Sequence, residues 1–157
     1  MTNSYPKNAI IVPLQMRWSD MDAYEHGNNG IYLTYLEEAR FRWRDGQYEG
    51  ATGSYIKDLL PDDVVNLVAS HRIEYVSQLQ YAKTDGNIYV RLWVCKIGTS
   101  SFTSAGIITD KSGEQVYVKS LSTLVQYNQN TQKSEPLSDE VKSYLESMHG
   151  PEPEFHG

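Results

Sequence analysis

The sequence predicts an α+β fold in which a strongly curved antiparallel sheet packs against one long amphipathic helix. The first supporting observation is a helical pattern within residues 30–44, where apolar side chains recur at steps of three and four. The second is a series of β-branched and aromatic segments after residue 63, separated by short turn signals. A helix with one apolar stripe needs a surface that covers it, and the sheet supplies that surface.

The apolar stripe of the long helix lies on one face, with charged residues elsewhere. Glu38 precedes Arg42 by four residues, which is the favourable order for an ion pair on a helix. Basic side chains near the end of this helix complement its dipole. These are Arg40, Arg42 and Arg44. The stripe itself consists of Tyr32, Tyr35, Leu36, Ala39 and Trp43.

The ends of the long helix also carry signals. Asn28 or Asn29 is expected to cap its start, and Gly46 is expected at the C′ position after its end. Its first backbone N–H groups, which have no partner inside the helix, would then lie close to Asp22 and His26.

The remaining elements follow in a simple order. A strand is expected at 10–18, with Pro13 indicating an edge position or a bulge. A short helix is predicted near 55–60, and Ser138 is predicted to cap a C-terminal helix whose stripe includes Val141 and Leu145. Turn signals at 85–87 and 111–113 separate the other strands, which are predicted at 64–79, 88–97, 100–110 and 115–127.

Composition and length are those of one globular domain. The chain has 157 residues, of which 39% are hydrophobic and 22% charged. We expect a single domain at 9–148, a flexible N-terminus at 1–8 and a flexible tail at 149–157. The net charge of −6, without a basic cluster, argues against nucleic-acid binding. No apolar run is long enough for a membrane helix, and no signal peptide is recognisable.

Cysteine and histidine usage points to a cytoplasmic protein without a metal site. Cys95 is the only cysteine, so no intrachain disulfide can form, and its apolar neighbours predict a buried strand thiol. The four histidines are scattered without the spacing of a metal site. We therefore expect no metal and no bound cofactor.

Chemistry-bearing residues concentrate in the loop before the long helix. Between Ser19 and Asn29 the chain has two Asp, one Glu, one His and two Asn. Asp20 and Asp22 can simply shape a turn or cap the helix. Alternatively, a carboxylate beside free helix N–H groups can act on a carbonyl whose developing charge those groups stabilise.

The residues from Arg17 to Arg40 read R-W-x-D-M-D-A-x-x-H-x-N-N-x-x-Y-L-x-Y-L-E-E-A-R. This pattern resembles the signature of acyl-CoA thioesterases of the 4-hydroxybenzoyl-CoA thioesterase family, which have the hotdog fold. The resemblance is ungapped over about a sixth of the chain, and the rest agrees in its layout of elements. It implies hydrolysis of an acyl-CoA thioester to a free acid and coenzyme A, with coenzyme A present only as part of the substrate.

The resemblance also assigns roles to individual residues. It makes Asp22 the catalytic carboxylate, acting either as a nucleophile or as a general base. It makes the backbone N–H of Asn29 the donor that polarises the thioester carbonyl. His26 can assist by donating to the carbonyl, or it can merely satisfy loop backbone groups. The chain departs from many members at Glu25 and Gly27, and this difference bears on the substrate rather than on the reaction.

Further expectations concern the substrate and a second subunit. Tyr24 and Asn28 are expected to contact the substrate. Ser100 and Ser101 either touch the acyl group or form a polar turn. The resemblance implies a homodimer, or a tetramer, in which the catalytic loop of one subunit meets the strands of its partner.

Two other functions remain open on the same fold. One is a hydratase or dehydratase acting on an enoyl thioester, which would pair a His with an acid. The other is a non-catalytic module that binds acyl-CoA. Fold similarity alone does not decide among these functions.

Overall fold

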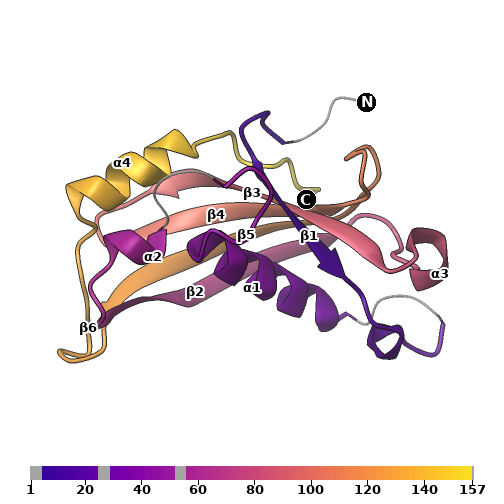
Figure 1. Ribbon diagram of the computed structural model, residues 1–157, viewed down its shortest axis with the longest axis horizontal. Helices are drawn as coiled ribbons and strands as arrows, with labels where there is room; N and C mark the ends of the chain where they lie inside the picture. The colour runs from indigo at the N-terminus through magenta and orange to yellow at the C-terminus, as the bar shows by residue number, and fades with distance from the viewer. Residues whose placement is uncertain (1–4, 25–28, 52–55, 157) are drawn as a thin grey trace.

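The computed structural model describes residues 5–24, 29–51 and 56–156. Its main feature is a curved, fully antiparallel sheet whose strands run in the order β1-β3-β4-β5-β2, with a short β6 paired to β5 (Figure 1). Sequence and sheet order agree with the predicted α+β class. The strands are β1 Ile10–Gln15, β2 Val64–Tyr75, β3 Asn87–Ile97, β4 Ser101–Thr109, β5 Val116–Asn128 and β6 Lys133–Ser134.

The helices match the expected positions, with two additions. The predicted long helix, short helix and C-terminal helix correspond to α1 Ile31–Arg44, α2 Ile56–Leu59 and α4 Asp139–Ser147. The Ser138 side chain accepts a hydrogen bond from the Val141 N–H, which confirms the predicted cap. A 3₁₀ turn, η1 (Trp18–Asp20), and a short helix, α3 (Tyr81–Thr84), were not apparent from the sequence pattern.

Helix α1 packs on the concave face of the sheet and buries the predicted stripe. All five stripe residues are buried and join the main core with inward-facing residues of the strands. A side chain of the helix packs against Gly106 of β4, where a Cβ atom would lie 3.0 Å from Leu36 Cδ2 and 3.2 Å from Leu92 Cδ2. A glycine is therefore required for this close approach.

The two ends of α1 agree only partly with the sequence prediction. At the C-terminal end, Gly46 has a φ of 73°, its N–H donates to the Trp43 carbonyl, and the Gln47 N–H donates to the Arg42 carbonyl. This pattern is a Schellman motif, so the prediction for Gly46 is confirmed. At the N-terminal end, the cap position is occupied by Gly30, not by Asn28 or Asn29, and glycine has no side chain with which to cap the helix.

The outer face of the sheet carries a second, smaller core. Residues 149–156, predicted to form a flexible tail, follow a defined path over this face instead. The Gly150 N–H donates to the Val94 carbonyl on β3, and the Trp93 Nε1–H donates to the Pro151 carbonyl at 2.8 Å. The Phe155 ring lies under the Arg72 guanidinium of β2, at 4.4 Å. The tail is thus held by packing and backbone hydrogen bonds that proline and glycine do not prevent.

The other end of the chain shares this surface. Residues 5–8 also pack on the molecule, with the Tyr5 ring 4.5 Å from the Arg91 guanidinium and the Asn8 amide donating to the His149 carbonyl. These described residues of the segment expected to be flexible therefore make aromatic and polar contacts with the rest of the chain.

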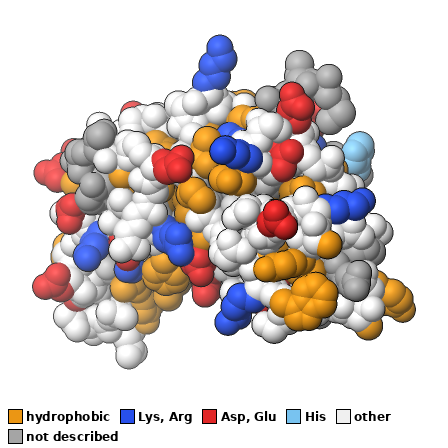
Figure 2. Space-filling model, turned by 45° about the vertical axis from the view of Figure 1, so that its right-hand side comes forward, with side chains coloured by type: hydrophobic (Ala, Val, Ile, Leu, Met, Phe, Trp, Pro, Cys, Tyr) orange, Lys and Arg blue, Asp and Glu red, His pale blue; other side chains and the backbone are white. Residues whose placement is uncertain are grey.

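Both edges of the sheet are defined by the strand order. β1 is one edge, as Pro13 indicates, and β2 is the other. Exposed hydrophobic side chains gather in patches between charged ones on the surface (Figure 2). On β2, Leu67 and Val68 are 46% and 43% exposed, which is unusual for apolar side chains of a long strand. The β2 edge is therefore open for pairing with another chain.

Candidate active site

Asp20 anchors the loop between β1 and α1. Its buried carboxylate accepts hydrogen bonds from the Tyr35 hydroxyl at 2.6 Å and from the Arg17 N–H at 2.9 Å. Burial and this hydrogen bond both raise the pKa of Tyr35, so the phenol remains a donor. These contacts turn the chain away from β1 after Gln15 and fix the 3₁₀ turn to the helix. The first Asp of the D-x-D pair therefore has a structural role.

Asp22 lies two residues further on, beside the first turn of α1. It is half-buried, and its Oδ1 accepts a hydrogen bond from the Tyr24 N–H at 2.8 Å. Burial raises the pKa of Tyr32, and the charge of Asp22 adds to this shift after that of Tyr75. The Asp22 carboxylate is therefore close enough to interact with the phenol of Tyr32, a side chain from the first turn of α1.

Tyr75, at the end of β2, fixes the residue that precedes this helix start. Its hydroxyl donates a hydrogen bond of 3.0 Å to the Asn29 carbonyl, and its ring lies 5.3 Å from the Tyr32 ring. The sequence did not indicate that Tyr75 or Tyr32 belongs to the site, and Tyr32 was predicted only as part of the apolar stripe of the helix. The pairing joins β2 to a helix start more than forty residues away in the chain, so no local pattern signals it.

Among the other loop residues that were predicted for the site, the structure describes only Tyr24. His26 and Asn28, with Glu25 and Gly27, lie outside the described residues. The Tyr24 side chain is 78% exposed in the single chain. Its contact with a substrate stays a prediction.

Ser100 and Ser101 lie at the opposite end of the sheet. Tyr75 pairs with Val118 of β5, which in turn pairs with Ile108 of β4. Ser101 is seven residues before Ile108, or about 23 Å along the strand. A single chain therefore does not bring Ser101 to Asp22, and a contact between Ser101 and a partner subunit's loop stays a prediction.

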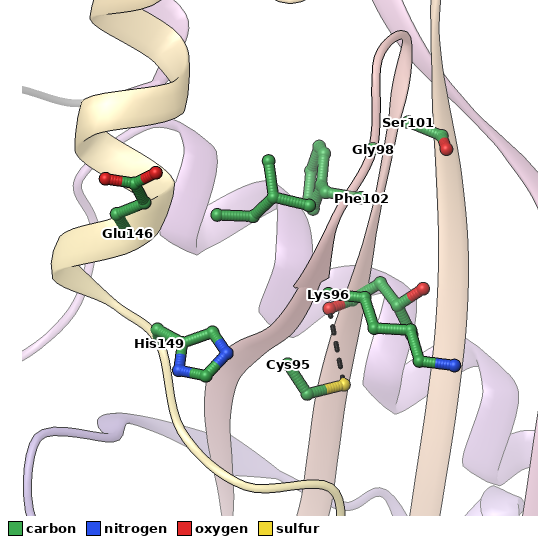
Figure 3. A pocket seen from close by; sticks show the side chains of 9 residues that line it. Cys95, Lys96, Gly98, Ser101, Phe102, Glu146 and His149 are labelled. Carbon is green, nitrogen blue, oxygen red and sulfur yellow. Dashed lines mark hydrogen bonds between the residues drawn. The ribbon is translucent and has the colours of Figure 1, made fainter.

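Ser101 instead lines a cavity of about 510 Å³ next to α4. Figure 3 shows the His149 ring, from the segment after α4, pointing toward Cys95, and Glu146, on α4, beside the same cavity. Cys95 is buried in β3, and burial raises the pKa of its thiol to about 11. This confirms the predicted inert strand thiol.

A second cavity, of about 470 Å³, opens between the C-terminal half of α1 and the β2 and β5 strands. Arg40 lines this groove and is only 9% exposed. The sequence pattern places Arg40 among the basic residues at the helix end, so its burial was missed. It results from the sheet, because Ser122 of β5 lies opposite on the concave face and accepts a hydrogen bond of 3.4 Å from Arg40 Nη1.

Two searches of the described residues complete the description of the site. Among them, no group of three or more His, Cys, Asp and Glu side chains is arranged to hold a metal ion. Within the same residues, no helix combines the length and the apolar character needed to cross a membrane.

A curved antiparallel sheet around one long helix, with an acidic loop at the start of that helix, defines a thioesterase of the hotdog fold. The chain belongs to the Thioesterase-like superfamily, whose family model matches residues 16–145.

Individual relatives agree with this membership. The chain is 28% identical over 141 residues to the long-chain acyl-CoA thioesterase FadM of Escherichia coli strain K12, covering 86% of this chain and 96% of the relative. Its fold is similar to the crystal structure of the probable thioesterase YbaW from Escherichia coli, with a TM-score of 0.70, 24% identity and coverage of 90% and 99% of the two chains. A thioesterase superfamily structure from Jannaschia sp. CCS1 gives a TM-score of 0.76 at 16% identity, covering 96% and 99%.

Proposed function

We propose that this thioesterase hydrolyses acyl-CoA thioesters, with Asp22 as the catalytic carboxylate. The observation that carries the proposal is the half-buried position of Asp22 in the segment that leads into α1, where its charge acts on Tyr32 of the first helical turn. The substrate class is supported by the E. coli relative, which is named as a long-chain acyl-CoA thioesterase. The products are a free carboxylic acid and coenzyme A.

Two routes use the same carboxylate. In the first, an Asp22 oxygen attacks the thioester carbon, the C–S bond breaks, coenzyme A leaves as the thiol after protonation, and water hydrolyses the resulting anhydride. In the second, Asp22 takes a proton from a water molecule that attacks the same carbon directly. In both routes the carbonyl oxygen becomes negative in the transition state, so both need a donor beside it.

The Asn29 N–H is the proposed donor to that oxygen. Asn29 immediately precedes the Gly30 cap position, so its N–H lies next to the helix N–H groups that have no acceptor inside α1. A positioned donor lowers the barrier by about 3 kcal/mol in other acyl-transfer enzymes. The hydrogen bond from Tyr75 to the Asn29 carbonyl holds this residue in place. Tyr75 therefore acts as a positioning residue in the proposed mechanism.

A second copy of the chain is part of the proposal. Pairing of two β2 edges would cover Leu67 and Val68 and satisfy backbone groups that one chain leaves open. A two-fold axis through the middle of β2 (Val64–Tyr75) would bring the end of one strand, at Tyr75, opposite the start of the other. Each catalytic loop would then face the partner's Val64 end, as the resemblance implies.

Free thiol release from a panel of acyl-CoAs tests the reaction. We expect Asp22→Asn to lower kcat/KM by roughly 10²–10⁴-fold, whereas Asp139→Asn, at the exposed start of α4, leaves it unchanged. Unchanged thiol release in Asp22→Asn would refute the role of this carboxylate. A change in enoyl absorbance without thiol release would instead indicate a hydratase, and binding without turnover would indicate an acyl-CoA-binding module.

The dimer has its own test. Light scattering with size-exclusion chromatography should give a dimer for the wild type and a monomer for the double variant Leu67→Lys/Val68→Lys, because lysines on an edge strand oppose pairing. Exposed Lys57, on α2, changed to Ala provides a control that stays dimeric. A wild-type monomer would exclude this part of the proposal.

A further inference from the structure

The groove beside α1 is built mainly from apolar side chains. It lies between the C-terminal half of this helix and the β2 edge, and its wall includes Phe41, Trp43, Ile56, Leu67 and Leu124. A mostly apolar groove with a few polar groups is the usual form of a site for a small organic ligand. An acyl chain fits this description along most of the groove.

Arg40 is the buried charged residue of this wall, which also includes the polar side chains of Glu37, Arg44, Asn66 and Gln129. Its only hydrogen bond within the described residues is the 3.4 Å contact with Ser122, which is long for an N–H···O bond. No carboxylate in the described part of the chain lies within 4.0 Å of its guanidinium group. Burying a guanidinium ion without a close anion is costly, so the arrangement favours an anionic ligand.

Burial lowers the pKa of Arg40, and the charge of Glu37, which lines the same groove, offsets this shift only in part. Ser122 Oγ also pairs with His71 Nδ1, at 2.8 Å. Burial, and then the charge of Arg40, lower the pKa of His71, which keeps this imidazole neutral near pH 7. Glu37, one turn earlier on α1, is exposed to solvent and forms no ion pair with Arg40. One buried cation and two neutral polar groups therefore meet at this point.

The distance from the reacting centre suits the far end of an acyl chain. Arg40 follows Asn29 by eleven residues, which corresponds to about 16 Å along a helix. Arg40 is joined through Ser122 to His71, close to the middle of β2, so a two-fold axis there would leave it similarly distant from both catalytic loops. An extended acyl chain of medium to long length spans this interval.

We propose that Arg40 binds a carboxylate at the distal end of the acyl group, so that the preferred substrates are ω-carboxyacyl-CoA thioesters. This inference rests on the proposed acyl-CoA hydrolysis and specifies its substrate class. The planar guanidinium group can donate two parallel hydrogen bonds to a carboxylate. A chain ending in a methyl group would leave the buried Arg40 without an anion, which disfavours it relative to the diacid ester.

The test compares matched pairs of substrates in the full-length protein. For each chain length, kcat/KM is measured by thiol release for a straight-chain acyl-CoA and for the ω-carboxyacyl-CoA with the same number of carbons. At the length that reaches Arg40, the wild type should prefer the ω-carboxy ester by roughly 10- to 100-fold, as expected for hydrogen bonds to a charged group. A ratio at or below one at every length would overturn the proposal.

Variants of Arg40 test whether this residue causes the preference for the ω-carboxy ester. Arg40→Met should abolish the ratio while retaining thiol release from the straight-chain ester, and Arg40→Lys should keep only part of the ratio because an ammonium group lacks the planar fork. Arg42→Met is the matched control, since Arg42 lies on the same helix but pairs with the exposed Glu38 outside the groove. An equal loss for both substrates in Arg40→Met would contradict a role in recognition.

Three further outcomes are distinguishable. If Arg40→Met converts a dimer to a monomer with an unchanged substrate ratio, Arg40 pairs with a second copy and the proposal is wrong. If the Arg40 variants do not fold, calorimetry on the wild type decides, because a free straight-chain diacid must bind more tightly than the monoacid of equal length. Absence of thiol release from every ester would instead refute the proposed function, and the calorimetric comparison would still test Arg40.

Discussion

The hydroxyl of Tyr75 donates a 3.0 Å hydrogen bond to the carbonyl oxygen of Asn29, and this contact joins the open edge of the sheet to the start of its long helix. The partners come from two elements that both belong to the proposed active site. Any displacement of β2 at this end is therefore transmitted to the backbone that would hold the thioester carbonyl. Positioning errors of this kind lower rates even when the reacting groups are intact.

The Tyr75→Phe variant removes that hydrogen bond and retains the ring. We expect kcat to fall about fivefold, because the lost bond is worth about 1 kcal/mol. The free energy of unfolding should fall by less than this, because Tyr75 is half exposed and water can replace the bond. Steady-state kinetics and urea unfolding separate the two effects. Tyr89→Phe on β3 is a control with the same chemical change. Equal kcat in Tyr75→Phe and the wild type would show that this bond does not position Asn29.

The Asp20–Tyr35 pair should matter for stability. Tyr35→Phe removes a 2.6 Å charge-assisted bond to a buried carboxylate, and we expect the free energy of unfolding to fall by about 1.5–3 kcal/mol. A double-mutant cycle with Asp20→Asn, followed by urea unfolding, measures the coupling between the two side chains. Strictly additive effects would mean that the pair does not hold the loop.

His71 should make stability depend on pH. Its pKa in the folded protein lies below the ordinary value of 6.5, mainly through burial and then through the charge of Arg40. The neutral ring is thus favoured by folding, so its contribution is present above pH 6.5 and is lost as the pH falls through the lowered pKa. NMR titration of the ring should show a higher pKa in Arg40→Met than in the wild type, while Arg42→Met leaves it unaltered. An unchanged pKa in Arg40→Met would disprove the coupling.

Gly106 should not tolerate a methyl group. The added Cβ of Gly106→Ala would meet Leu36, Leu92 and Ser120 Oγ at 3.0–3.2 Å, so helix and sheet would have to separate slightly. Overpacking of this kind costs about 1–3 kcal/mol of unfolding free energy. Urea unfolding measures the cost, and the double variant Leu36→Ala/Gly106→Ala should show less than additive destabilisation. Additivity would argue against direct contact.

The C-terminal segment should contribute to stability although it contains no helix or strand. Deleting residues 151–157 removes the acceptor of the Trp93 indole N–H and the ring beneath Arg72. We expect a loss of at least about 2 kcal/mol and a red shift of tryptophan fluorescence as Trp93 is exposed to water. Lys133→Ala, at the exposed β6 pairing, is a control for a small surface change. A truncated protein of wild-type stability would show that the segment is dispensable.

Local periodicity was sufficient to predict most of the fold. The apolar stripe of α1 and the Ser138 cap depend on residues a few positions apart, and both are confirmed. The five main strands lie where they were predicted, but β1 ends at Gln15 and β2 at Tyr75, short of the predicted residues 18 and 79. The start of α1 was predicted less well. Asn28 and Asn29 are good capping residues, but Gly30 occupies the cap position and Asn29 instead accepts a bond from Tyr75. The hydrogen bond to Asn29 comes from Tyr75 on a distant strand, so a capping rule based on neighbouring residues does not predict it.

For the candidate site, the sequence predicted which loop residues carry the chemistry, but it did not predict the contacts that surround them. The motif identified Asp22 and Asn29, but neither the clamp by Tyr75 nor the burial of Arg40 follows from spacing along the chain. Both arise because β2 and β5 present Tyr75 and Ser122 to the concave face beside α1. The tail was mistaken for a loose end because proline and glycine exclude regular structure without excluding specific contacts.

The path of residues 149–156 limits how larger assemblies of this protein can form. The segment crosses from β3 to β2, where the His156 N–H donates to Glu74, and so covers the convex surface of the sheet. Two dimers could stack through those convex surfaces only after this strap had been displaced. Any tetramer of the intact chain should therefore assemble through its helices or loops, and shortening the C-terminus should be the simplest way to create a new quaternary contact.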